Sequence, residues 1–218
     1  YPDLVHAHFT RIAAMASVLK KTHKIPFVIT EHSSKMIEPT LSKELIYYAE
    51  KAYFNADEVV CVSKSLADNL YEKFKINCKL IPNIVDTDKI SYRPMDHSKF
   101  TFISVGNLIQ RKGFDILLSA FRNMKNVDTQ LHIIGSGEER GNLQNFINTH
   151  ELNTRVKLLG YKNREEIAGI MNMGDAFVLA SKRETFGVVF IEAMLAGLPV
   201  VATRCGGPEN FINKSNGI

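Results

Sequence analysis

Two glutamates, Glu184 and Glu192, frame an apolar run that begins at Gly187. A short apolar segment over 175–180 is typical of a buried strand, and the run after Gly187 is typical of a buried helix that ends at another glycine. Gly187 and Val188 are therefore expected at a helix start, where unpaired N–H groups and the helix dipole favour a phosphate. The pattern fits a nucleotide-sugar site, with Glu184 on the loop within reach of a sugar and Glu192 within reach of a ribose.

Apolar segments of strand type alternate with helical patterns along the chain, which favours an α/β fold with parallel sheets. In the first half we expect strands near 4–7, 27–30, 58–62 and 79–81, and helices near 11–23, 41–55 and 64–74. In the second half we expect strands near 100–105, 130–134, 156–159, 176–180 and from 200, and helices near 114–124, 141–150, 164–173 and 188–197. The stretch between the halves is polar and aperiodic. We therefore predict a first domain over 1–90, a linker over 91–99 and a second domain over 100–218.

Composition places the chain among ordinary globular proteins. It has 218 residues, of which 45% are hydrophobic, enough to bury one large core or two small ones. The net charge of +4 comes from scattered basic residues, which argues against a nucleic-acid partner. The 3 cysteines are far apart in sequence, so we expect neither a zinc site nor a disulfide framework, as in a reducing compartment. We expect no membrane-spanning segment and no signal peptide, and Tyr1 reads as an internal residue.

The residues from Ser181 to Ala202 fit the pattern S-x-x-E-x-F-G-x-x-x-x-E-A-x-x-x-G-x-P-V-V-A. This string resembles the retaining glycosyltransferases of family four, whose GT-B fold has two Rossmann-like domains facing a cleft. Two glutamates at this spacing occur by chance in many helices, whereas the whole string is specific. The chain is also similar to the family at 3–8 (D-x-x-H-x-H), 30–32 (T-x-H), 62–70 (V-S through leucine) and 81–86 (I-P-N-x-V-D, with Ile84 in place of a glycine).

A further segment, 105–115, is similar to the family's G-R-L-x-x-x-K-G-x-D, whose arginine and lysine hold the donor diphosphate. Lys112 matches the lysine, and Asn107 stands in place of the arginine. The adjacent Arg111 is left open as a second cation. Positive charge suits this position because the leaving group is a nucleoside diphosphate whose negative charge grows during the reaction. Without the resemblance, Arg111 and Lys112 would be a solvated pair in a loop.

The histidines near the N-terminus are interpreted from their place on the strands and from the resemblance. His32 follows an apolar strand and is expected at the carboxyl end of a parallel strand, where ligands of open α/β sheets bind. The resemblance places it near the donor sugar. His6 and His8 could form a metal pair, but no third ligand lies nearby in the sequence, so we interpret both as structural. His8 is kept as a weaker candidate for a site residue.

Two other motifs bear on the ligand. Gly135 and Gly137 follow a strand, as in the dinucleotide fingerprint G-x-G-x-x-G, but Arg140 stands where the fingerprint needs its last glycine. This departure argues against the alternative that the chain is an NAD-linked oxidoreductase. The resemblance instead implies that this loop lines the nucleotide pocket. Asp86 and Asp88 spell D-x-D, a metal and diphosphate motif of the other large glycosyltransferase fold. They fall where the polar stretch between the two halves begins, and aspartates in such stretches are more often turn residues.

The resemblance implies transfer of a hexose from a UDP- or GDP-sugar to a hydroxyl acceptor with retention of configuration. The residues carried over as catalytic are Glu184, His32 and Lys112, and those carried over as donor-binding are Glu192, Gly187, Val188, Phe186, Arg111, Asn107, Gly135 and Gly137. No metal and no cofactor besides the donor is implied. The acceptor would be a saccharide or a lipid-linked saccharide in cell-surface polysaccharide or glycolipid synthesis.

The extent of the chain and its location in the cell also bear on this interpretation. The family's first strand, its glycine-rich loop and its last helices have no counterpart here, so we expect the middle of a longer enzyme, incomplete at both ends. A nucleotide-sugar-binding module without catalysis is then the leading alternative. The resemblance implies a cytoplasmic protein, and the basic helix face with Arg11, Lys20, Lys21 and Lys24 could rest on an anionic membrane. A solvated face is the simpler interpretation of that helix.

Overall fold

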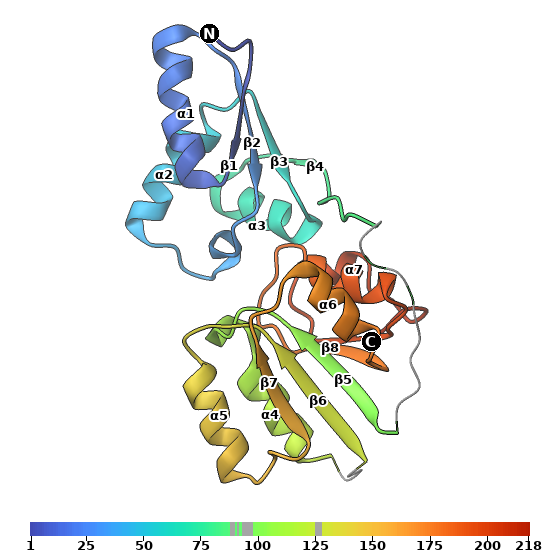
Figure 1. Ribbon diagram of the computed structural model, residues 1–218. Coiled ribbons are helices and arrows are strands. Elements are labelled where there is room, and N and C mark those ends of the chain that lie inside the picture. Colours follow the sequence, from blue (N-terminus) through green and yellow to red (C-terminus); the bar gives the residue numbers. More distant parts are fainter. Residues whose placement is uncertain (88–89, 91, 93–97, 125–127) are drawn as a thin grey trace. The chain divides into compact units, whose positions relative to one another are not determined.

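The computed structural model describes residues 1–87, 90, 92, 98–124 and 128–218 (Figure 1). The described chain divides into two compact units. The first contains Tyr1–Asn83 with Glu184–Phe186, and the second contains Ile84–Arg183 with Gly187–Ile218. Each unit is built on a parallel sheet with helices, which confirms the predicted α/β class. Most of the predicted linker, like Asp88 of the D-x-D motif, lies outside the described residues.

The first unit has a four-stranded sheet in the order β1-β2-β3-β4, with every pair parallel. Its strands are β1 (Val5–His8), β2 (Phe27–Glu31), β3 (Glu58–Cys61) and β4 (Lys79–Leu80), and its helices are α1 (Thr10–His23), α2 (Lys43–Tyr53) and α3 (Lys64–Phe74). A short 3-10 turn, η1 (Ser34–Ile37), follows β2. Serine side chains begin two of the helices, because Ser42 and Ser63 each accept a bond from a first-turn N–H.

The second unit has a five-stranded parallel sheet in the order β7-β6-β5-β8-β9. The strands are β5 (Phe100–Val105), β6 (Thr129–Ile134), β7 (Val156–Gly160), β8 (Ala176–Leu179) and β9 (Val200–Ala202). The helices are α4 (Phe114–Arg122), α5 (Arg140–Thr149), α6 (Arg164–Met171) and α7 (Val188–Leu195), with 3-10 turns η2 (Gln110–Lys112) and η3 (Gly207–Asn210). Buried side chains from the strands and from α4, α5 and α7 form one core.

The predicted elements are all present, and their ends differ by a few residues. The helix expected over 188–197 ends at Leu195, because Gly197 takes the left-handed conformation with φ of 79°. The central strands are buried as parallel strands usually are, for example Leu131 and Ile133 in β6, which are 0% and 1% exposed, whereas the edge strand β4 is exposed.

Two cysteines that are distant in the sequence come close together in the fold. Cys61 and Cys78 are distant along the chain, yet β3 and β4 run side by side with Cys61 opposite Leu80. The two thiols share a hydrogen bond, which raises the pKa of Cys61 and lowers that of Cys78. Both are free thiols, as is Cys205.

Candidate active site

The second sheet has a topological switch at its centre. From β5 the chain moves to β6 and β7 on one side, and then crosses to β8 and β9 on the other side. The loops that follow β5 and β8 therefore leave in opposite directions at the carboxyl edge of the sheet, where ligands of such folds usually bind. The first of these loops carries Lys112, and the second leads to Gly187 at the start of α7.

The position of Lys112 is fixed by the glycine that follows it. Gly113 has φ of 65°, and a Cβ there would come within 1.9 Å of the main-chain oxygen of Ala180. Only glycine therefore lets the turn η2 pack against the end of β8. The Lys112 side chain runs along Gly106, where an added Cβ would lie 3.6 Å from the Lys112 Cδ. The turn thus carries a half-buried cation at the switch point.

Arg111, which the sequence left open, ties two loops of this unit together. Its Nη1 donates to the main-chain oxygen of Arg183 at 2.7 Å, and its own carbonyl accepts from the Lys182 N–H at 2.8 Å. The guanidinium thus braces the loop after β8 against the turn that carries Lys112. Asn107, in the place of the family's arginine, is exposed on the same loop after β5.

Gly135 and Gly137 also have a packing role that the sequence did not reveal. A Cβ on Gly135 would lie 1.9 Å from the Gly106 oxygen, and one on Gly137 would lie 2.3 Å from the Leu108 oxygen. The two loops also exchange main-chain bonds, with the Leu108 N–H donating to Ser136 at 2.8 Å. The glycines therefore let the loop after β6 seat directly on the loop after β5. Contact between these glycines and a nucleotide stays a prediction.

The start of α7 has the geometry expected for an anion site. Gly187 precedes the helix with φ of 89° and ψ of 54°. A Cβ there would come within 2.8 Å of the Phe190 Cδ2 and 2.9 Å of the Pro208 Cγ, so a larger residue would disturb the helix start. The first N–H groups of a helix have no carbonyl one turn further back. In α7 the Phe190 N–H already donates to the Gly187 oxygen at 3.0 Å, so the N–H groups considered for an anion are those of Val188 and Val189. Val188, at this end of α7, lines a cavity within the second unit.

Glu192 borders a cavity of about 400 Å³ within the second unit. The residues that line this pocket are Ile84, Val85, Asp86, Ile90, Arg164, Ile167, Val188 and Glu192. Burial raises the pKa of Glu192 above its ordinary value, and the charge of Arg164 partly offsets that effect. The pocket therefore combines apolar walls with carboxylates and one guanidinium, which suits a base and its ribose.

Arg164 is a pocket residue that sequence reasoning missed. It is the first residue of α6, whose start is fixed by a capping box between Asn163 and Glu166. The Glu166 N–H donates to Asn163 Oδ1 at 2.9 Å, and the Asn163 N–H donates to Glu166 Oε2 at 2.9 Å. The N-x-x-E pattern predicts this helix start. Nothing local, however, predicts that α6 begins beside α7.

The raised pKa of Glu192 leads to a pH prediction. If Glu192 holds a ribose, as the sequence predicts, its ionised carboxylate can accept two hydroxyl bonds, whereas the protonated acid has lost its charge and part of its acceptor capacity. The advantage of wild type over Glu192→Gln in UDP affinity should therefore be full at neutral pH and shrink as pH falls through a value above 4.5. Calorimetric titration of both proteins at a series of pH values measures it. A ratio of dissociation constants that is independent of pH would contradict ionisation of Glu192 in the complex.

The first unit holds the other predicted site residues. His32 directly follows β2, half-buried, and Glu184 and Phe186 are both 6% exposed in the short segment that belongs to this unit. Within the unit, the Thr185 hydroxyl donates to the main-chain oxygen of His32 at 3.0 Å. Burial and the neighbouring His8 lower the pKa of His32, so the neutral imidazole is favoured.

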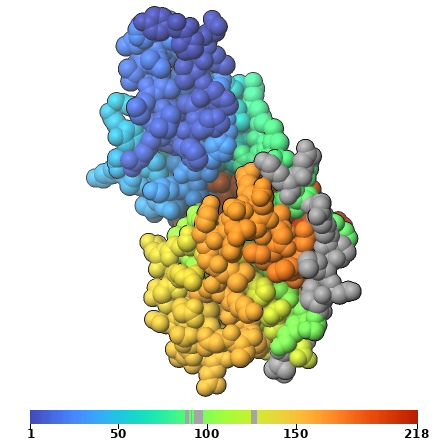
Figure 2. Space-filling model, viewed as in Figure 1, coloured from blue at the N-terminus to red at the C-terminus, as the bar shows by residue number. Residues whose placement is uncertain are grey.

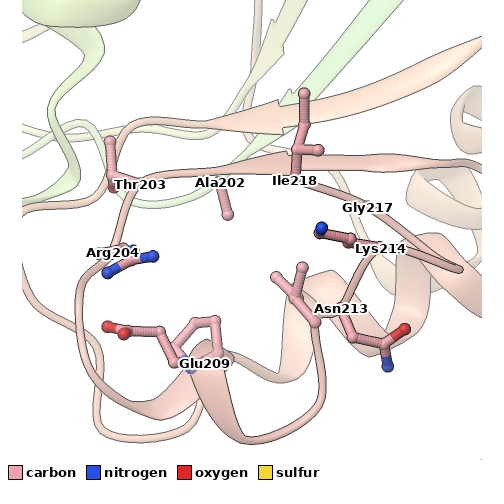
Figure 3. Close-up of a pocket in the computed structure, with 10 residues that line it drawn as sticks. Ala202, Thr203, Arg204, Glu209, Asn213, Lys214, Gly217 and Ile218 are labelled. Atoms are coloured by element: carbon pink, nitrogen blue, oxygen red, sulfur yellow. The ribbon is translucent and has the colours of Figure 1, made fainter.

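A second cavity of about 380 Å³ lies in the second unit between β9 and the C-terminal segment (Figure 3). Arg204, Glu209 and Lys214 are among the residues that border it. None of the predicted site residues lines it, so the two cavities are separate features of the fold.

Within the described ranges, no three His, Cys, Asp or Glu side chains are arranged to hold a metal ion. None of the helices in the same part of the chain is both long and apolar enough to cross a bilayer.

Two family models together match the whole chain. "Glycosyl transferases group 1" matches residues 87–218, and "Glycosyltransferase Family 4" matches residues 1–89. The chain is 33% identical over 218 residues to an uncharacterised glycosyltransferase, MJ1178, of Methanocaldococcus jannaschii, covering 99% of this chain and 60% of that protein. The chain therefore belongs to the family-four glycosyltransferases, and this membership leaves the NAD-linked alternative without support.

Two further relatives add detail. One subunit of the human phosphatidylinositol N-acetylglucosaminyltransferase is 29% identical over 225 residues, covering 96% of this chain and 46% of the human protein. The Anabaena protein HepE, solved in complex with UDP, has a TM-score of 0.87 at 24% identity, covering 99% of this chain and 64% of that one. The latter likeness confirms the GT-B fold. The chain spans between about half and two thirds of the length of these proteins.

Proposed function

We propose that this chain is the donor-binding part of a retaining glycosyltransferase that moves a hexose from a UDP- or GDP-sugar to a hydroxyl acceptor. The observation that carries the proposal is the pocket of about 400 Å³, in which Glu192 and Arg164 line the same cavity as Val188 at the start of α7. A nucleoside diphosphate fits such an arrangement, because its ribose needs an acceptor and its phosphates need N–H donors and a cation.

Each predicted residue then has a physical task. Glu192 accepts hydrogen bonds from the ribose, while the first N–H groups of α7 and the Lys112 ammonium stabilise the departing diphosphate. These groups are already fixed by the glycines at 113 and 187, so little reorganisation is needed as charge develops. Glu184 and His32 position the donor sugar. No side chain is assigned as a covalent nucleophile, since the leaving phosphate itself takes the acceptor proton.

Two arguments concern the donor. The relative solved with UDP supports a uridine nucleotide over a guanosine nucleotide. A metal ion is not required, because Lys112 and the α7 dipole supply the positive charge that a metal would otherwise provide. The acceptor is proposed to be a saccharide or a lipid-linked saccharide, in line with the phosphatidylinositol that appears in the name of the human relative.

Titration calorimetry with UDP and GDP tests the proposal, together with an assay of donor hydrolysis and transfer in the whole protein. We expect saturable binding of one nucleotide and release of nucleoside diphosphate from the matching sugar. Binding without any turnover would favour the alternative, a nucleotide-sugar-binding module. Absence of binding to either nucleotide would overturn both.

We also propose a peripheral contact with an anionic lipid surface through α1. Ile12, Met15 and Val18 are exposed on this helix at a spacing of three residues, and Lys21 and the C-cap residue Lys24 are also exposed. The helix belongs to the blue region of Figure 2. Lys20, Lys21, Lys24, Phe54 and Asn55 line a shallow cavity of about 370 Å³ at the end of the helix. Apolar side chains beside ammonium groups are typical of helices that rest on membranes.

Charge reversal at Lys21 and Lys24 tests this contact. Each lysine near an anionic surface contributes about 1 kcal/mol, so the double change to glutamate should lower vesicle affinity about tenfold or more. Lys75→Glu with Lys157→Glu is the charge-matched control, since both lysines are exposed elsewhere. Co-sedimentation with phosphatidylserine vesicles measures the effect. Equal losses in the two double variants would indicate general charge attraction and contradict a docking face on α1.

A further inference from the structure

A buried carboxylate in the first unit has no role in the reaction described so far. Glu31 ends β2 and is 0% exposed. A buried charge is tolerated only when its hydrogen-bonding capacity is filled. Glu31 meets this condition with four donors, two from the main chain and two from hydroxyl groups.

The two oxygens of Glu31 serve different parts of the structure. Oε1 accepts from the N–H of His32 at 3.0 Å and from the N–H of Ser33 at 2.8 Å. Oε2 accepts from the Thr10 hydroxyl at 2.5 Å and from the Tyr53 hydroxyl at 2.7 Å. Burial and the Glu31 charge raise the pKa of Tyr53, so its hydroxyl stays protonated and able to donate. Oε1 therefore fixes the main chain of the loop that begins with His32. Oε2 connects the end of β2 to the first residue of α1 and the last residue of α2.

The ring of His32 is held by a second group. The Nδ1 of His8, at the end of the neighbouring strand β1, lies 3.0 Å from the Nε2 of His32. The two rings are stacked with centroids 5.2 Å apart. Such a bond needs one N–H and one lone pair, so the tautomer of one ring sets the tautomer of the other.

The surroundings of His32 are specialised in a further respect. Phe9 has φ of 68°, an unusual conformation for a bulky residue, and its ring lies 5.2 Å from that of His32. Its backbone is held by bonds from the Phe9 N–H to Thr30 and from the Ala13 N–H to Phe9, both 3.1 Å. Backbone strain of this kind persists where a local geometry matters, and it concentrates at functional sites.

We propose that Glu31 and His8 are positioning residues for His32, the carboxylate fixing its main chain and the imidazole fixing its ring. The inference rests on the proposed function, in which His32 positions the donor sugar. The titratable groups that face His32 are His8 and His6 from β1 and Glu31 from β2. His6 is itself occupied, since its Nε2 lies 2.8 Å from the Thr30 hydroxyl. Of these groups, His8 is therefore the one that holds the His32 ring.

The ring is tested by NMR of the imidazole nitrogens, which reports the tautomer directly and does not depend on activity. In wild type we expect a single tautomer for His32, and in His8→Phe, which keeps a stacked ring without the nitrogen, a mixture of tautomers. In Glu31→Gln we expect faster hydrogen exchange of the His32 and Ser33 amides, because charge-assisted bonds become neutral ones. Unchanged tautomer and exchange in these variants would overturn the proposal.

The functional consequence is measured in the whole enzyme. Glu31→Gln and His8→Phe should each lower kcat on the order of tenfold, while the Kd for the free nucleotide stays constant. Tyr53→Phe is the matched control, because it removes a bond to Oε2 and leaves Oε1 and the His32 loop intact. It should lower the melting temperature without lowering kcat. A fall in kcat for Tyr53→Phe equal to that for Glu31→Gln would indicate a purely structural network. Failure of wild type to bind UDP or GDP would remove the proposed function and leave the ring measurement to decide the positioning role.

Discussion

Replacing Lys112 with alanine is expected to lower kcat on the order of a hundredfold, with a much smaller change in donor affinity. In the proposed mechanism the ammonium stabilises the departing diphosphate, whose negative charge is greatest as the bond to the sugar breaks. Interactions that strengthen in the transition state affect kcat, whereas interactions that are equal in the ground state affect KM. Steady-state kinetics in the whole enzyme and nucleotide titration together separate the two effects.

Lys157→Ala provides the control for Lys112, because Lys157 is an exposed lysine of the same unit on β7. It should leave both kcat and donor affinity unchanged. Chelation with EDTA should also leave wild-type activity unchanged, since the positive charge comes from the protein. An enzyme that EDTA inactivates and manganese restores would contradict this mechanism and revive the metal interpretation of Asp86 and Asp88. Loss of affinity with kcat intact would reduce Lys112 to a docking residue.

Replacing Glu192 with alanine is expected to weaken UDP binding about tenfold or more. A hydrogen bond to a charged group contributes about 1.5 to 3 kcal/mol, and each 1.4 kcal/mol changes an equilibrium constant about tenfold. The fold should persist, because α7 is anchored by Phe190 and Ala193, both 0% exposed, on its other side. Titration calorimetry measures the affinity, and circular dichroism checks the fold.

Glu165→Ala is the matched control, since Glu165 is an exposed glutamate in the first turn of α6, next to Arg164. Its loss should leave UDP affinity unchanged. Equal affinities for wild type and Glu192→Ala would exclude Glu192 from the ribose site. Arg164→Ala offers a complementary check, because it borders the same pocket without sharing a helix with Glu192.

Most of the fold was predictable from local pattern. Parallel strands buried on both faces appear as short apolar runs, and amphipathic helices between them require crossover connections, so the α/β class follows from the alternation. Gly113 and Gly187 were predictable as turn positions. They stand at strand-to-helix junctions, and the structure shows a positive φ at both. The family string from Ser181 to Ala202 depends on the same local features.

The sequence by itself therefore determined the α/β class, the elements and the expected ligand chemistry, because these depend on residue type and spacing along one segment. Only the tertiary structure decided which distant residues meet. Arg164 lies beside Glu192 because α6 and α7 border the same pocket, and Arg111 binds the Arg183 carbonyl because β5 and β8 are neighbours in the sheet. Glu31 becomes a buried four-fold acceptor only when α1 and α2 pack over β2 and bring Thr10 and Tyr53 to it. Contacts of this kind join residues far apart in the chain, so no local periodicity encodes them.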